Sequence, residues 1–234
     1  GYMGPMDFTC ANPTLAGNIP SQVPENSSGD CKTGTLGGQE SFVMRGNLRI
    51  VPSDSLEINI NGDLLDDRGE PAAEKLIDVN TDGTSPLALY QPGSPLGPDP
   101  TGYGIPFDKR FITPDGYTSY VNFTDTRNNL TFPRVSNVRS WGVSGKVDWS
   151  ITPDLKLTSI SAYRSYNGEF IENWAAAPIH VNDNYFKPYH HQFSQELRLN
   201  GKIGTVAEWT VGGYYFDALT ELNDYIYIPV VGFA

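Results

Sequence analysis

Hydrophobic and polar residues alternate with a period of two in three stretches of this chain. In residues 138–164, Trp141 and Trp149 fall on one face with the odd-numbered positions between them, whereas Lys146 falls on the opposite, polar face. Alternation of this kind, broken by a short turn at residues 152–154, is typical of two strands in a β-hairpin.

Two further stretches show the same pattern. Residues 42–62 alternate on either side of a turn at 52–55, and residues 191–220 alternate around a turn at 200–204, with Gln195 as a polar interruption. The faces of residues 158–170 stay unassigned because the alternation blurs there. We therefore predict an all-β chain of about six antiparallel, up-and-down strands.

The connections between these strands are very unequal in length. They are a few residues long within each hairpin, but about 66–136 and about 167–190 between hairpins. Loops beyond about 12–15 residues are uncommon in compact domains. Outer-membrane barrels have this asymmetry, with short periplasmic turns and long extracellular loops.

The polar face of the hairpins mixes charges of both signs with amides. The lumen of a large barrel would carry such residues, and so would the solvated surface of a β-sandwich. The candidate lumen-facing residues are Arg45, Asn47, Arg49, Glu57, Asn59, Asn61, Asp63, Lys146, Asp148, Glu196 and Arg198.

The apolar face carries large aromatic side chains near its ends. Trp141 and Trp149 are separated by roughly 27 Å along a strand, at about 3.4 Å per residue. With a tilt near 40° this separation rises roughly 20 Å, close to the apolar band of about 25 Å of an outer-membrane barrel. We predict a membrane belt of Trp141, Trp149, Trp209 and Tyr215; alternatively, these aromatics fill a core.

Composition and charge narrow the class of protein. The 234 residues include 12% aromatics and carry a net charge of −11, which argues against a nucleic-acid partner. No apolar run approaches the roughly 18–20 residues of a membrane-spanning helix. The first residues do not form a signal peptide, so we expect that a signal was removed or that the chain begins within a longer protein.

Cys10 and Cys31 are the only cysteines, and they flank a stretch rich in Gly, Pro, Asn and Ser. A disulfide that closes this loop fits an oxidising compartment, and stabilises by roughly 3 kcal/mol in the loop-entropy model. Two free thiols remain the alternative, because sequence alone does not set pairing.

Two candidate metal sites stand out. Asp78, Asn80 and Asp82, followed by Gly83, match the start of a calcium loop, although Leu89 stands where an EF-hand has its bidentate Glu. The alternative is a solvated acidic turn. His180, His190 and His191 suggest a metal less directly, because adjacent strand residues point to opposite faces.

Three glycosylation sequons begin at Asn26, Asn122 and Asn129; they favour a secreted protein if the source is eukaryotic. No motif for a catalytic nucleophile, a zinc protease or a phosphate-binding loop is present. Carboxylate pairs such as Asp66-Asp67 indicate a solvated acidic loop rather than a catalytic site.

The stretches ESFVMRGNLRIVPSDSLEINI, VRSWGVSGKVDWSITPDLKLTSISAYRSY and FSQELRLNGKIGTVAEWTVGGYYF resemble the barrel of TonB-dependent outer-membrane receptors. The resemblance is closest in KLTSISAYR and FSQELRL, and it covers the hairpins, about half of the chain. It implies a barrel of about 22 strands filled by a plug domain.

The resemblance also implies a place and an activity. Such receptors lie in the outer membrane of Gram-negative bacteria, and import a siderophore, a vitamin or a glycan through an inner-membrane energy-coupling partner. We find no plug, coupling box or terminal aromatic strand here. We therefore expect residues 1–234 to be a partial barrel domain, with lipid, a plug and the remaining strands as partners.

Two other functions remain open. A secreted all-β binding module, such as a lectin-like sandwich, shares the alternation and the sequons. A β-rich glycan hydrolase that uses loop carboxylates is a third hypothesis. Neither the transported solute nor a cofactor other than calcium is indicated by the sequence.

Overall fold

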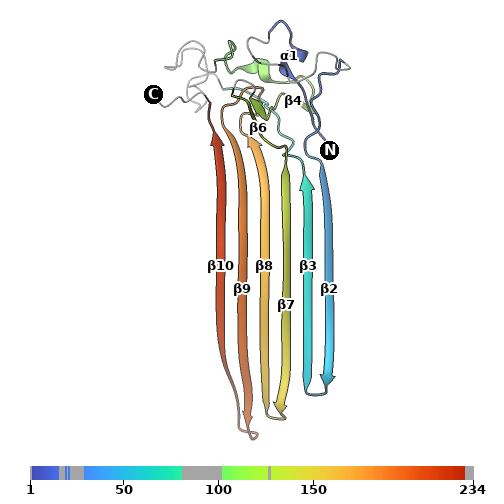
Figure 1. Cartoon of the computed structure of the whole chain (residues 1–234), viewed down its shortest axis with the longest axis vertical. Helices are drawn as coiled ribbons and strands as arrows, with labels where there is room; N and C mark the ends of the chain where they lie inside the picture. The colour runs from blue at the N-terminus through green and yellow to red at the C-terminus, as the bar shows by residue number, and fades with distance from the viewer. Residues whose placement is uncertain are drawn as a thin grey trace.

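The computed structural model describes residues 2–15, 19, 21, 29–80, 102–125 and 128–229. Six long strands lie side by side in one antiparallel sheet, and the segments between them gather at one end (Figure 1). The all-β, up-and-down prediction is confirmed. The sheet follows chain order: β2 (Gln39–Ser53), β3 (Leu56–Gly69), β7 (Ser136–Thr152), β8 (Leu155–Asn173), β9 (Asp183–Ile203) and β10 (Ala207–Tyr227).

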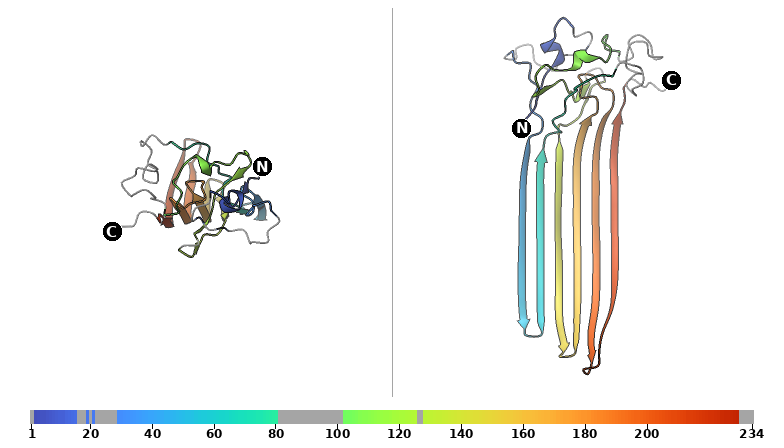
Figure 2. Two further views of the ribbon diagram at one scale, coloured as in Figure 1. Left: turned by 90° about the horizontal axis from the view of Figure 1, so that it is seen from above. Right: turned by 180° about the vertical axis from the view of Figure 1, so that it is seen from behind.

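The three hairpin turns lie at the far end of the sheet and are shorter than predicted (Figure 2). β2 continues through Ser53, so the first turn is residues 54–55 rather than 52–55. The predicted third turn at 200–204 is wrong: β9 continues to Ile203 and the turn is 204–206. Lys202 N–H donates to Asp154 O (3.0 Å), which keeps this backbone extended.

The long connections fold into a second part of the molecule, which we call the cap. It comprises the described residues of 2–36, 70–80, 102–135 and 174–182. The predicted connection 167–190 is too long, because β8 and β9 extend into it and leave 174–182 between them. The cap contains α1 (Phe8–Ala11), the 3₁₀ helix η2 (Lys109–Phe111), and the short strands β1 (Gly4–Pro5), β4 (Thr118–Ser119), β5 (Thr124–Asp125) and β6 (Leu130–Thr131).

The buried hydrophobic residues lie mostly in the cap. One cluster packs Phe8 against Phe111 and Tyr120, with ring centroids 5.1 Å apart in both contacts. A second cluster joins Phe123 and Phe132 of the cap to Ile171 near the end of β8. These clusters were not predicted, because their hydrophobic residues follow no period.

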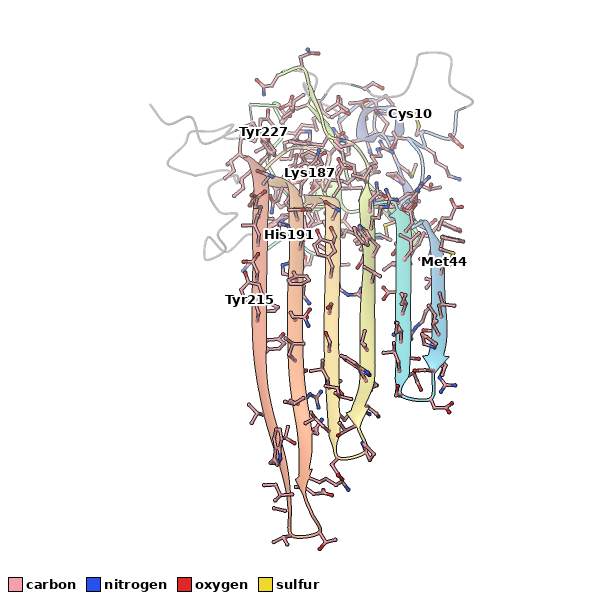
Figure 3. All side chains as sticks on the ribbon, turned by 60° about the horizontal axis from the view of Figure 1, so that its bottom comes forward. Cys10, Met44, Lys187, His191, Tyr215 and Tyr227 are labelled. Atoms are coloured by element: carbon pink, nitrogen blue, oxygen red, sulfur yellow. A yellow bond between two sulfur atoms is a disulfide. The ribbon has the colours of Figure 1, made fainter. Side chains whose placement is uncertain are left out.

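The sheet, in contrast, is a single layer. The other sheets in the described part of the chain have two strands each, and lie in the cap. Side chains project from both faces of the six strands along their length (Figure 3). Large hydrophobic residues are therefore exposed, among them Phe42, Leu48, Ile60, Trp141, Val143, Trp149, Leu197, Val211 and Tyr215. No helix among the described residues is long and apolar enough to cross a membrane.

Candidate functional site

The strand register separates two chemically distinct faces of the sheet. Directly paired residues in neighbouring strands point to the same face. Asn47, Asn61 and Ser144 are paired in this way, as are Arg49, Asn59 and Lys146. All eleven predicted lumen-facing residues fall on this face, which we call the charged face; they are Arg45, Asn47, Arg49, Glu57, Asn59, Asn61, Asp63, Lys146, Asp148, Glu196 and Arg198.

Ion pairs connect the strands across the charged face. Arg49 Nη2 lies 2.7 Å from Glu57 Oε2, and Arg164 Nη2 lies 2.7 Å from Asp63 Oδ1. Asp148 accepts from both Lys146 (2.7 Å) and Lys156 (3.0 Å). These pairs are partly exposed, so each contributes less than about 1 kcal/mol in water. Together these pairs give the charged face side chains of both signs that lie close to one another.

Sequence reasoning missed several charged members of this face, among them Lys156, Arg164, Lys202 and Glu208. Arg164 was missed because the faces of residues 158–170 were left unassigned. The register explains the difficulty. Ile160 and Ala162 lie on the charged face, whereas Ser159 and Ser161 lie on the opposite face. Polarity therefore no longer marks the side of the strand, and only its pairing with β7 and β9 does.

The opposite face, which we call the aromatic face, carries the four predicted belt residues. Trp141 and Trp149 pair with Leu64 and Leu56 of β3, and Trp209 and Tyr215 lie on the same side of β10. Trp141 is 40% exposed and Trp149 44% exposed. The alternative that these two tryptophans fill a core is wrong for the described part of the chain.

Gln195 is the polar interruption on the aromatic face, and its hydrogen bonds are internal. Its Nε2 donates to Ser159 Oγ (3.0 Å), and Ser161 Oγ donates to its Oε1. Because the three side chains satisfy one another, this apolar surface tolerates them without leaving their polar groups unpaired.

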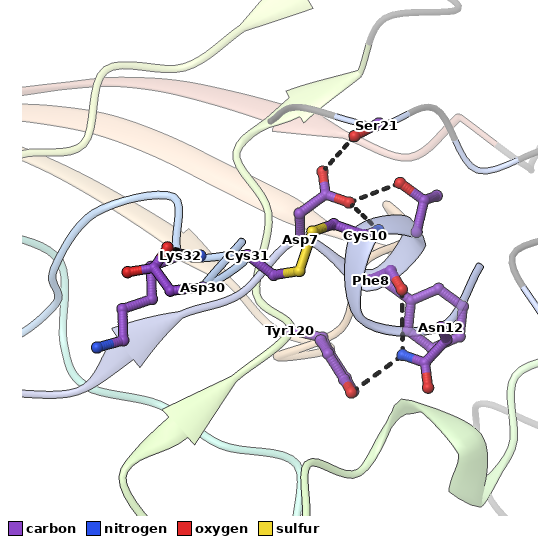
Figure 4. The surroundings of a disulfide bond; sticks show 10 residues. Asp7, Phe8, Cys10, Asn12, Ser21, Asp30, Cys31, Lys32 and Tyr120 are labelled. Atoms are coloured by element: carbon purple, nitrogen blue, oxygen red, sulfur yellow. Dashed lines mark hydrogen bonds between the residues drawn. A yellow bond between two sulfur atoms is a disulfide. The ribbon is translucent and has the colours of Figure 1, made fainter. Parts of the chain in front are cut away.

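The disulfide predicted between Cys10 and Cys31 is confirmed, and it lies in the cap (Figure 4). Asp7 holds both ends of this loop together. Its carboxylate accepts from Cys10 N–H (2.8 Å) as the N-cap of α1, and its own N–H donates to Cys31 O (2.8 Å). The bridge therefore closes a loop whose ends are already held together by hydrogen bonds.

A buried polar cluster joins the cap to β10. His180 Nδ1 shares a hydrogen bond with Asp183 Oδ2, and Tyr227 Oη donates to Asp125 Oδ2 (2.7 Å). The rings of His180 and Tyr227 meet edge to face at 5.9 Å. Burial alone lowers the pKa of His180, but the hydrogen bond and charge of Asp183 outweigh burial and raise that pKa above 6.5.

The histidines do not form a metal centre. His180 is buried in the cap, whereas His190 and His191 lie on opposite faces of β9. In the described ranges, no group of three or more His, Cys, Asp or Glu side chains could hold a metal ion.

The calcium motif is described only in part. Asp78 Oδ1 lies 2.9 Å from Lys109 Nζ, and this hydrogen bond holds the pKa of Asp78 below its usual value. Asn80 interacts with other residues of the chain, and Asp82 lies outside the described residues. Calcium binding at this motif stays a prediction.

One of the three sequon asparagines, Asn122, is buried and hydrogen-bonded within the cap. Asn122 is 5% exposed, and its Nδ2 donates to Thr124 O (2.8 Å). To carry a glycan, the Asn122 side chain would have to break that hydrogen bond and move out of the interior of the cap. Asn129 precedes β6, and Asn26 lies outside the described residues.

A shallow groove of about 260 Å³ crosses four strands on the aromatic face, just on the cap side of Trp141. Ionisable side chains surround it, including Arg139 and Lys187. Glu169 accepts a hydrogen bond from Tyr185 Oη and lies 3.2 Å from Lys187 Nζ, so both groups contact this carboxylate. Sequence reasoning missed the groove, because its residues come from β3, β7, β8 and β9.

No family model matches this chain, and no curated protein matches it.

Proposed function

We propose that the sheet is a section of the transmembrane barrel of a TonB-dependent outer-membrane receptor, which imports a small solute with an inner-membrane energy-coupling partner. The first support is the sheet itself. A single layer with one apolar and one charged face is unstable in water, but suits lipid on one side and a polar lumen on the other. β2 and β10 have free edges on which further strands would pair.

The second support is the stagger of the hairpin turns. Leu56 pairs with Trp149, yet β7 continues to Thr152; Leu155 pairs with Gly201, yet β9 continues to Ile203. The second turn is thus displaced along the strands from the first, and the third from the second, by about 5.5 residues in total between turn midpoints. This is roughly 18 Å at about 3.3 Å per residue. Across the strands, the first and third turns are separated by four strand spacings of about 4.8 Å. Turns in one plane thus require a strand tilt of about 43°, near the 35–45° of outer-membrane barrels.

The third support, which carries the proposal, is the border of the apolar surface. Going from each turn toward the cap, the first charged or His residue on the aromatic face is Glu40, Asp66, Arg139, Glu169, His191 or Asp217. Counted from its own turn, each lies about 12–16 residues away. Followed through directly paired residues, Glu40 is level with Arg68 of β3 and Asp217 is level with Gly62, so along lines perpendicular to the strands the border drifts by about six residues. The distance of the border from the turns varies less than this, so the border runs closer to the line of the turns than to the perpendicular.

The height of this surface fits a bilayer. The outermost large apolar residues lie on average about 11 residues from the turns, among them Phe42, Trp141 and Tyr215. At about 3.3 Å per residue and a tilt of about 43°, they rise roughly 27 Å, against about 25 Å for the apolar band of an outer-membrane barrel. A soluble protein has no reason to keep the border of its apolar surface parallel to the line of its hairpin turns.

The cap and the charged face suggest how the solute is handled. The strands continue past the border, so the cap would stand outside the bilayer, and its disulfide suits an oxidising exterior. There it is placed to meet the solute first, and the charged face would line the path and contact a plug. Uptake driven through an energy-coupling partner rests on the family resemblance alone.

Reconstitution of the chain tests this proposal against the secreted binding module. Refold the chain with and without lipid vesicles, and follow heat-modifiable migration on gels and protection from protease. We expect the sheet to be protected only with lipid, and the exposed cap to be cleaved. A monodisperse, cooperatively folding monomer without lipid or detergent contradicts the proposal and supports the secreted module.

A further inference from the structure

The groove on the aromatic face lies at the proposed border of the membrane. Its floor is the paired row of Asp66, Arg139 and Asn167, and Arg139 is the next residue on this face after Trp141. Lys187, which also lines the groove, lies nearer to the cap than His191 and Tyr215 (Figure 3). In a bilayer bounded by the tryptophan, this groove is at the level of the lipid headgroups.

The charges in the groove are arranged with the cations outward. Arg68, Arg139 and Lys187 are exposed, whereas Asp66 and Glu169 are half-buried. Arg68 Nη2 lies 3.0 Å from Asp66 Oδ2, and Glu169 accepts from Lys187 and from Tyr185. Both carboxylates are thus already held by partners within the protein.

Arg139 differs from the other two cations. It forms no ion pair with any residue that the structure describes, and it stands between the two acid–base pairs. Asp67 also lines the groove, but its side chain belongs to the charged face, where it accepts from Gln39 and Ser41. On the aromatic face the three cations and two carboxylates give a local charge of +1, although the whole chain carries −11. A guanidinium without an ion-pair partner offers paired donors that match the oxygens of a phosphate.

We propose that this groove binds the phosphate of an outer-leaflet lipid headgroup, with Arg139 as the principal contact and Lys187 and Arg68 beside it. The inference rests on the proposed function, since only a chain in a bilayer brings headgroups to this height. The position of the groove favours a lipid over a free anion, because the acyl chains of a bound lipid would lie along the apolar surface around Trp141, on the turn side of the groove. The site would fix the height of the sheet in the membrane.

Native mass spectrometry of the chain released from nanodiscs tests the proposal. The nanodiscs contain phosphatidylcholine and either a phosphorylated glycolipid or its dephosphorylated form, and inorganic phosphate is the free-anion probe. We expect the phosphorylated lipid to be retained at least fivefold better than the dephosphorylated form. The double variant Arg139→Gln/Lys187→Gln should lose this preference, whereas Arg45→Gln, on the charged face, should keep it.

The outcomes separate this site from the proposed function. Insertion into nanodiscs with equal retention of both lipids overturns the lipid site and leaves the barrel proposal standing. Inorganic phosphate that displaces the lipid at equal concentration indicates a general anion site, and also overturns the inference. Failure to insert even where chains can pair with one another through the edges of β2 and β10 overturns both proposals. Unchanged retention in the double variant shows that the lipid binds elsewhere.

Discussion

A charge placed on the aromatic face should destabilise the folded chain by an amount set by its depth. Ile60 on β3 lies about 5.5 residues from its turn, or roughly 13 Å above it at about 3.3 Å per residue and a tilt of about 43°. This position is near the middle of the proposed apolar band. Ile60→Arg should therefore lower the free energy of unfolding by about 2–4 kcal/mol, the cost of arginine at the midplane of an outer-membrane barrel.

Two variants on the same strand serve as controls. Leu56→Arg lies about 1.5 residues from the turn, roughly 4 Å in height, where the cost falls to about 0–1 kcal/mol. Asn61→Arg points to the charged face, where Asn47 and Ser144 are its neighbours, and should cost less than about 1 kcal/mol.

Reversible urea unfolding in lipid vesicles, followed by tryptophan fluorescence, measures all three variants. The loss in the free energy of unfolding should be largest for Ile60→Arg, and smaller by similar amounts for Leu56→Arg and Asn61→Arg. Equal small costs at Ile60 and Leu56 would show that the aromatic face meets water at every height, and would refute the membrane reasoning. A large cost at Asn61 would refute the assignment of the two faces.

Three further predictions concern local features. Gly201→Ala should lower the free energy of unfolding by about 1–3 kcal/mol, because a Cβ there would lie 2.2 Å from an indole ring. Gly213→Ala should be nearly neutral in the same urea assay, because a Cβ there would have no atom within 4 Å. Replacing Cys10 and Cys31 with Ser should destabilise the cap by roughly 3 kcal/mol, measured as faster proteolysis of the cap with the sheet still protected. The pKa of His180 is raised above 6.5 in the folded chain, so its stabilisation is complete below pH 6.5 and is lost as the pH rises through the folded value. The protease resistance of the cap should therefore fall as the pH is raised from 6.5, and should fall less in His180→Gln. Proteolysis that does not depend on pH would contradict the last of these.

The hairpins and their faces were predictable because hydrophobic and polar side chains separate onto the two faces of most strands. Alternation in β2, β3, β7 and β9 marks this separation directly, and it predicted correctly that all eleven candidates lie on one face. In β8 the contrast is lost, because Ser159 and Ser161 on the aromatic face are satisfied by Gln195. A local pattern cannot show a polar group whose partner is on the next strand.

The third turn was wrong for a physical reason. Asn200-Gly201 is a strong turn signal, because glycine reaches conformations that other residues avoid. Here Gly201 remains in β9, and its missing Cβ makes room for the ring of Trp209 on β10. The turn forms at Gly204, which has a positive φ of 55°. Packing across strands decided the role of each glycine.

The cap and the groove were beyond the reach of sequence patterns. Phe8, Phe111 and Tyr120 come from distant segments with no shared period, so only their contacts reveal one cluster. The groove likewise collects three residues from each of β3, β7 and β8 and one residue from β9. Its position relative to the hairpin turns could be read only from the register of these four strands.

The most direct test of the central claim is a spin-label accessibility scan along β7. Single cysteines, in a background with Cys10 and Cys31 replaced, are labelled from residue 139 to 149 in vesicles, and oxygen is compared with a water-soluble nickel complex. The account predicts that odd positions from 141 to 149 are exposed to oxygen and even positions to nickel, and that position 139 returns to water. Nickel accessibility at odd and even positions alike would contradict a membrane-embedded sheet.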